Sequence, residues 1–90
     1  MVVKDSALNE GSEMEAVSGE PIAGTTETFQ FYGGTEQAGR IADVFMVGTD
    51  RIANLIVGES KHGIRQIGHG QLGSLWVVTG GWYERGELAA

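Results

Sequence analysis

Cysteine is absent from this 90-residue chain, and histidine occurs only twice. The lack of cysteine excludes disulfides and thiolate metal sites, which often support domains this small. A chain of this length forms one domain and buries only ~60% of the surface that it exposes when unfolded. We therefore expect oligomerisation or docking onto a larger body to complete its burial.

Long apolar runs are also missing. No segment approaches the ~18 consecutive apolar residues that a membrane-spanning helix needs, and residues 1–19 contain no apolar core of an export signal. From the residues alone, we expect no membrane partner and a cytoplasmic location.

Basic residues are scarce in the first part of the chain. Residues 1–36 contain seven acids and a single base, Lys4, whereas residues 37–90 contain five of each, so the net charge of −6 arises from the first part. An acidic segment repels phosphate backbones, and five scattered bases form no basic stripe, so we expect no nucleic-acid partner. The acidic segment is interpreted as a solvated arm, or alternatively as an arm that reaches a basic surface on a protein.

Two compositions meet near Thr25. Residues 1–25 are mostly polar and contain the only proline, Pro21, and only Val2, Val3, residues 14–17 and Ile22 could anchor them. We predict an acidic, extended N-terminal arm over residues 1–25 and a compact β-rich domain over residues 26–90.

The chain has fifteen glycines, and twelve of them divide the second part into short segments rich in β-forming residues. Each glycine inside a helix costs ~1 kcal/mol relative to alanine, so long helices are disfavoured. Strands are predicted over residues 28–32, 40–47, 51–57, 63–67 and 75–79, with residues 82–85 continuing the last strand or pairing with it. The predicted fold is mostly β: a small antiparallel sandwich or barrel with an extended N-terminal arm and, at most, one short helix.

Residues 36–57 permit two interpretations. Ala38, Ile41, Ala42 and Phe45 have helical spacing, but β-branched residues cluster here and glycines end both segments, which favours strands. The near repeat of GRIADVFMVG and DRIANLIVG is interpreted as two successive strands with similar packing demands, in preference to a duplicated unit.

Patterns that carry chemistry are weak. His62 and His69 lack the third and fourth ligands of a metal site. Gly68, Gly70 and Gly73 match the G-x-G-x-x-G pattern, but a strand is predicted directly after them where a dinucleotide site needs a helix. We therefore expect no catalytic residues, no metal, no cofactor and no enzymatic activity.

Aromatic residues suggest a binding surface. Alternation places Phe29 and Phe31 on one face of their strand, and Trp76 with Ser74 and Val78 on one face of another. Large apolar residues occupy both faces, so we expect one face to meet the core and the other a partner, with core packing alone as the alternative. The strands are too few to close on themselves, so a neighbouring molecule is expected to finish their burial. The interface candidates are Phe31, Tyr32, Trp76, Trp82 and Tyr83.

The stretch IGHGQLGSLWVVTGGWYERGEL resembles part of the capsid cement, or head-decoration, proteins of tailed phages. In that family a Gly-x-x-Gly turn leads into an apolar strand, a glycine and an aromatic, acidic segment. Gly70, Gly73, Val77, Gly80 or Gly81, and Tyr83 are the matching positions. The resemblance implies a structural protein on the virion surface, often trimeric, whose arm lies across capsid subunits.

A second stretch, GRIADVFMVGTDRIANLIVG, is similar to the opening hairpin of PRC-barrel domains through Gly39, Ile41, Asp43, Val44 and Asp50. That resemblance implies a small β-barrel that acts as a protein-binding adaptor. A small, acidic, phage-encoded inhibitor of a host nuclease or polymerase shares the size and charge of the chain and is a third alternative.

Overall fold

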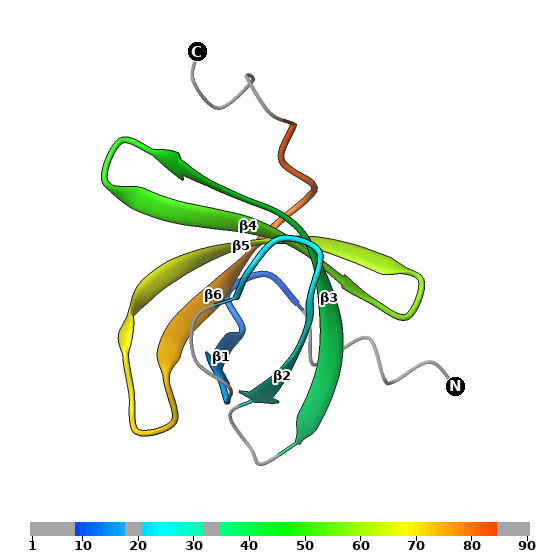
Figure 1. Cartoon of the computed structure of the whole chain (residues 1–90), viewed down its shortest axis with the longest axis vertical. Coiled ribbons are helices and arrows are strands. Elements are labelled where there is room, and N and C mark those ends of the chain that lie inside the picture. The colour runs from blue at the N-terminus through cyan, green and yellow to red at the C-terminus, as the bar shows by residue number, and fades with distance from the viewer. Residues whose placement is uncertain (1–8, 18–20, 32–34, 85–90) are drawn as a thin grey trace.

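A computed structural model describes residues 9–17, 21–31 and 35–84 of the chain. These residues form β-strands and no helix (Figure 1). Each strand pairs antiparallel with the next, and the first pairs with the last, so the sheet closes into a barrel. The strands are β1 (Glu13–Ala16), β2 (Thr26–Phe31), β3 (Glu36–Val47), β4 (Asp50–Val57), β5 (Ser60–His69) and β6 (Ser74–Gly80).

The prediction of a mostly β antiparallel fold is confirmed, and so is the strand interpretation of residues 36–57. β3 and β4 form a hairpin whose two-residue turn contains Gly48 in the left-handed region, at a φ of 63°. Side chains with helical spacing in β3 instead take their positions from cross-strand pairs such as Ile41 with Leu55 and Phe45 with Ile52. Sheet pairing therefore overrides the weak helical periodicity of this segment.

Strand β1 corrects the predicted domain boundary. The acidic arm was expected to extend to residue 25, but Glu13–Ala16 is part of the barrel. Met14 pairs with Phe31 of β2 and with Trp76 of β6, and Met14 and Ala16 are buried. Without β1, strands β2 and β6 would each expose an open edge, and an open edge invites pairing with other chains.

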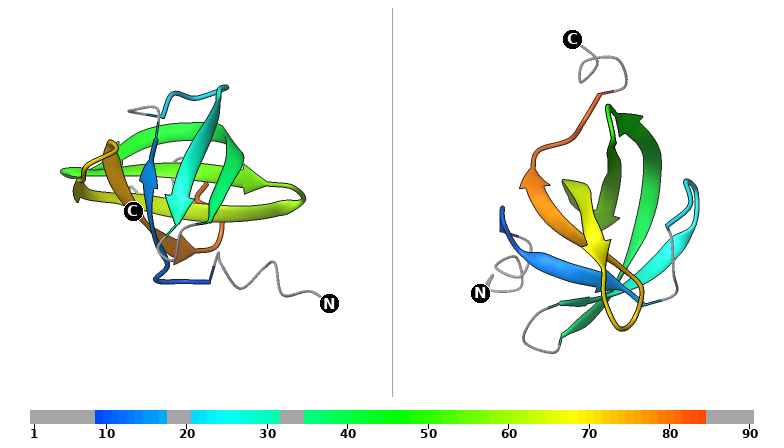
Figure 2. Two further views of the ribbon diagram at one scale, coloured as in Figure 1. Left: turned by 90° about the horizontal axis from the view of Figure 1, so that it is seen from below. Right: turned by 90° about the vertical axis from the view of Figure 1, so that its left-hand side faces the viewer.

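Closure of the barrel also shows that one expectation was wrong. The strands were judged too few to close on themselves, yet pairing of β1 with both β2 and β6 closes the sheet within one chain. Two views at right angles to Figure 1 show the strands wrapping around a common interior (Figure 2).

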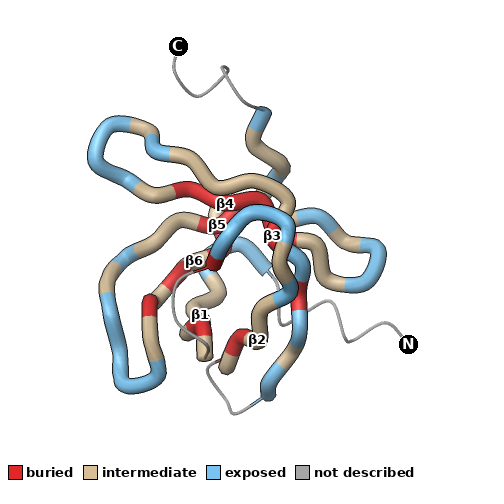
Figure 3. Tube along the Cα trace, viewed as in Figure 1, coloured by how far each residue is buried: buried red, intermediate tan, exposed pale blue. Residues whose placement is uncertain are grey.

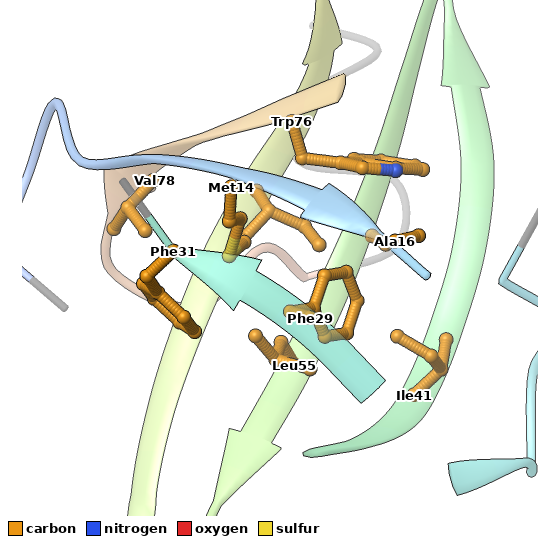
Figure 4. Close-up of a cluster of buried hydrophobic side chains, with 10 residues drawn as sticks. Met14, Ala16, Phe29, Phe31, Ile41, Leu55, Trp76 and Val78 are labelled. Atoms are coloured by element: carbon orange, nitrogen blue, oxygen red, sulfur yellow. The ribbon is translucent and has the colours of Figure 1, made fainter. Parts of the chain in front are cut away.

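The core fills this interior. It consists of Met14, Ala16, Phe29, Phe31, Ile41, Ala53, Leu55, Ile64, Trp76 and Val78 (Figure 4). Val44 and Val57 are partly buried and pack against it. Buried and less buried residues alternate along β1, β2 and β6, as expected for strands with one face inside a barrel. The predicted shared faces of Phe29 with Phe31, and of Ser74 with Trp76 and Val78, are therefore confirmed, and the structure adds that both faces point into the barrel.

Three hairpins extend beyond the barrel. The turns that join β3 to β4, β4 to β5 and β5 to β6 project in different directions (Figure 1). Their outer ends are exposed, whereas buried residues gather where the strands cross (Figure 3). The register shifts in β3 between Ile41 and Asp43 and in β5 between Gln66 and Gly68 mark where these strands bend away from the body.

Candidate protein-binding surface

The structure separates the five predicted interface residues. Phe31 and Trp76 are only 3% and 0% exposed and belong to the core, so their prediction as contact residues was wrong. Both lie on strand faces that barrel closure turns inward, and the strand sequences alone do not reveal which face that is. Tyr32 lies outside the described residues. Trp82 and Tyr83 are half-buried and follow β6.

Residues 81–84, which we call the strap, run along the outside of the barrel instead of forming the predicted strand. Asn54 of β4 holds them in place. Its side-chain Nδ2 donates a hydrogen bond to the Tyr83 carbonyl at 2.7 Å, and the Tyr83 N–H donates to Asn54 Oδ1 at 2.9 Å. One side-chain amide thus satisfies both backbone groups of Tyr83, as a neighbouring strand would do.

Asn54 is completely buried although it faces away from the core. It alternates along β4 with Ala53 and Leu55, which are core residues. Burial of an amide is favourable only when its polar atoms are hydrogen-bonded, and the strap provides that pairing. Sequence reasoning missed Asn54; the available signal was one amide inside the apolar run RIANLIV.

Gly63 of β5 lies directly under the strap. A Cβ atom at this position would collide with the Gly81 carbonyl oxygen and would lie 2.5 Å from the Tyr83 ring. Thr79 Oγ1 donates to the Gly63 carbonyl at 3.1 Å and lies 2.5 Å from the Tyr83 hydroxyl oxygen. Since the threonine hydroxyl has only one hydrogen, the tyrosine hydroxyl is the donor of the second bond. The absence of a side chain at Gly63 therefore allows this close packing.

Trp82 contributes the outer aromatic surface of the strap. The ammonium nitrogen of Lys61, an exposed residue of β5, lies 5.2 Å from the centroid of the indole ring. This distance is within the range of a cation–π interaction, which orients the ring against the strand. We call Lys61, Trp82 and Tyr83 the strap surface.

Further apolar side chains are exposed away from the strap. Ile22, Met46, Ile67 and Leu72 are 63%, 55%, 42% and 45% exposed. Met46 lies near the β3–β4 turn, while Ile67 and Leu72 lie near the β5–β6 turn. The barrel closes and fills its core without these four side chains.

The two histidines, which were considered as metal ligands, lie in different environments. His69 is exposed at the end of β5, whereas His62 is half-buried and pairs in register with the core residue Leu55. Within residues 9–17, 21–31 and 35–84, no group of three or more histidine, aspartate or glutamate side chains is placed to hold a metal ion.

The G-x-G-x-x-G match spans the end of β5 and the β5–β6 connection and is followed by strand β6, as predicted. The N–H of Gly70 donates to the Gly73 carbonyl at 2.7 Å, and the N–H of Leu72 donates to the Glu15 carboxylate at 2.9 Å. This segment is therefore a hairpin turn that a carboxylate of the same chain stabilises, whereas a pyrophosphate site needs a helix N-terminus at this point.

Comparison with protein-family models, with curated proteins and with solved structures finds no match. In the part of the chain that the structure describes, no helix has the length and apolar character needed to cross a membrane.

Proposed function

We propose that this protein is a structural or interaction module that binds another protein and, in its most specific form, decorates a viral capsid. The observation that supports this proposal is apolar and aromatic surface outside a barrel whose core is already complete. Such surface is available to a partner, because the fold does not need it for its own interior.

The strap surface is suited to binding because it is held in place before a partner arrives. Asn54 fixes the backbone of Tyr83, and Lys61 lies over the ring of Trp82. Tryptophan and tyrosine are enriched among the residues that dominate binding energy. A surface ordered in advance loses less conformational entropy on association, which favours affinity.

Capsid decoration is favoured by the resemblance described above. Gly70 and Gly73 lie in the β5–β6 connection, Val77 lies in β6, and Tyr83 lies in the strap. A decoration protein binds a repetitive shell, so many weak, identical contacts add up to strong attachment. Small surfaces such as the strap surface suffice for that mode of binding.

A protein-binding adaptor is the second candidate function. The stretch that resembles PRC-barrel domains forms the β3–β4 hairpin within a small closed barrel, which is the kind of fold that the resemblance implies. Here the hairpin is formed by the third and fourth strands, whereas the resemblance concerns an opening hairpin.

The test measures the copy number bound to particles. Purified viral particles from the source of the chain are incubated with the intact protein, separated by density, and the bound protein is quantified. Decoration predicts saturation at a fixed, high copy number per particle, and Trp82→Ala lowers the bound copies at least about tenfold at limiting concentration. The matched control is Gln71→Ala, at an exposed position of the β5–β6 turn, which leaves binding unchanged.

An adaptor gives a different result in the same experiment: it stays in the soluble fraction and forms a complex of fixed composition with one protein. The proposal of a binding module is contradicted if the protein neither saturates particles nor forms any complex of fixed composition.

A further inference from the structure

Strand β3 is longer than its pairing with β2. Register with β2 ends at Arg40, and the last backbone bonds on that side join Ile41 to Gly24 and Thr25. Beyond this point β3 continues to Val47 and pairs with β4 on its other side. On the side away from β4, no strand in the described ranges pairs with this part of β3.

The hairpin register identifies the backbone groups at this edge. Val47 and Asp50 flank the two-residue turn, so in an antiparallel hairpin they exchange hydrogen bonds, and the pair of Phe45 with Ile52 does the same. Val44 and Met46 alternate with these residues, so their N–H and C=O groups point away from β4. We call Val44 to Met46, residues 44–46, the β3 edge.

The β3 edge lacks the usual protection of an open strand. Residues 44–47 are Val-Phe-Met-Val, with no proline, lysine or glycine among them, and the Met46 side chain is 55% exposed. Apolar strand edges of this kind are templates for the addition of another strand. The hairpin projects from the barrel body, which gives a second chain access to it (Figure 1).

We propose that a second copy of this chain pairs with the β3 edge, antiparallel and about a two-fold axis that passes beside Phe45. This register places Val44 opposite the partner's Met46 and Met46 opposite the partner's Val44. The residues of each pair exchange backbone hydrogen bonds. It places Phe45 opposite the partner's Phe45 in the closer, non-hydrogen-bonded type of pair, where aromatic side chains contact across strands.

Charge and symmetry favour a second copy as the occupant. Asp43 is the only charged residue in residues 43–47, and the two-fold register places it opposite the partner's Val47, so like charges do not face each other. The edge is therefore complementary to itself, as a two-fold interface requires, and the pairing closes as a dimer.

A competing edge lies at the end of β5. Its register with β4 ends at Arg65, and residues 66–69 pair only with β6 within the described ranges. Gly68 and the register shift between Gln66 and Gly68 interrupt this segment, which makes it a poorer template. Pairing of the β3 edge with the β5 edge of another copy would also leave both remaining edges free, so it would form open chains.

This inference deepens the proposed function, because a paired module doubles its contacts with a repetitive surface. Its test is nevertheless separate, since it uses the isolated protein. A monomer that still saturates particles would overturn only the dimer, and a dimer that binds nothing would overturn only the proposed function.

The first experiment measures the mass of the intact protein in solution over a wide range of concentration. The expected result is a monomer–dimer equilibrium without larger species. Met46→Pro removes an edge-directed N–H that β4 does not use, and we expect it to raise the dimer dissociation constant more than about a hundredfold. Met46→Lys, which leaves the backbone intact, is expected to have the same direction of effect if the proline variant fails to fold.

Two control variants, one at another exposed apolar position and one conservative change at Met46, give the contrary outcomes. Ile67→Lys on β5 and Met46→Leu should leave the dimer intact. The proposal is overturned if the wild-type protein is a monomer throughout, if the species grow without limit, or if Ile67→Lys dissociates the dimer and Met46→Lys does not.

The second experiment tests the register, and the absence of cysteine from the chain makes it specific. Under mild oxidation Phe45→Cys should form a disulfide-linked dimer, because the two-fold register brings the two positions within the Cα separation of about 4.4–6.8 Å that a disulfide needs. Met46→Cys is diagonal to its own copy and should cross-link at least about tenfold more slowly. Equal rates, or faster linkage through Met46→Cys, would overturn the register.

Discussion

The interior of the barrel and the outer side under the strap are both buried, but they are buried by different means. Strand β4 shows the contrast directly, since Ala53 and Leu55 face the core whereas Asn54 faces the strap. The interior is filled by apolar side chains from all the strands, whereas the strap is held largely by directed hydrogen bonds to Asn54 and Thr79. We therefore expect loss of core contacts to unfold the domain, whereas loss of one strap contact releases the strap alone.

The largest effect is expected inside the barrel. Trp76 is fully buried and pairs with Met14 across the β1–β6 junction that closes the sheet. Trp76→Ala should lower the free energy of unfolding by about 3–5 kcal/mol, because it removes apolar contacts and leaves a cavity. Urea unfolding measures the change, and Leu72→Ala, at an exposed apolar position, should stay within about 0.5 kcal/mol of the wild type. Similar losses for both variants would contradict the described core.

The next effect concerns the amide beneath the strap. Asn54→Ala leaves the N–H and C=O of Tyr83 without their partner and should cost about 2 kcal/mol. Hydrogen exchange should show faster exchange of the Tyr83 amide, while amides of β6 that face β5 keep their protection. Uniform loss of protection along β5 and β6 would show instead that strap and barrel unfold together.

A smaller effect is expected at Gly63, where the strap packs against bare backbone. Gly63→Ala introduces a methyl group that collides with the Gly81 carbonyl and the Tyr83 ring. The strap must move, and we expect a loss of about 1–2 kcal/mol. Gly81→Ala is the matched control, since a Cβ there meets no atom within 4 Å. Equal stability of Gly63→Ala and the wild type would contradict the close packing of the strap.

The smallest effect should follow removal of one hydroxyl. Tyr83→Phe deletes the hydrogen bond to Thr79 Oγ1 but keeps the ring and both backbone bonds to Asn54, so the expected loss is about 1 kcal/mol. Thermal unfolding of Tyr83→Phe, Thr79→Val and the double variant measures their coupling. Strictly additive losses would show that the two hydroxyls act independently.

Much of the fold was predictable from local patterns. Glycine-bounded segments of β-forming residues predicted five of the strands, and alternation placed Phe29 with Phe31 and Trp76 with Val78 on shared faces. Two points were not predictable in this way. The short polar-flanked segment at Met14 has too few residues to signal a strand by itself, and strand parity cannot say which face of β6 lies inside.

The candidate surface was predictable only in part. Trp82 and Tyr83, which were predicted as interface residues, lie half-buried in the strap, and their role in binding stays a prediction. Asn54 and Gly63 were not named, although they position the strap. Their importance depends on Tyr83, which is distant in sequence from both, and no local pattern encodes a contact over that separation.

The amino-acid sequence by itself determined strands β2 to β6, the turns between them and the lack of disulfides, since these depend on side-chain periodicity, glycine conformation and composition over a few neighbouring residues. Tertiary structure alone decided that β1 closes the barrel, that Trp76 faces inward, and that the Asn54 side chain hydrogen-bonds to the backbone of Tyr83. These outcomes depend on pairing between residues far apart in the chain, where geometric fit of the whole sheet, rather than any local preference, selects the partner.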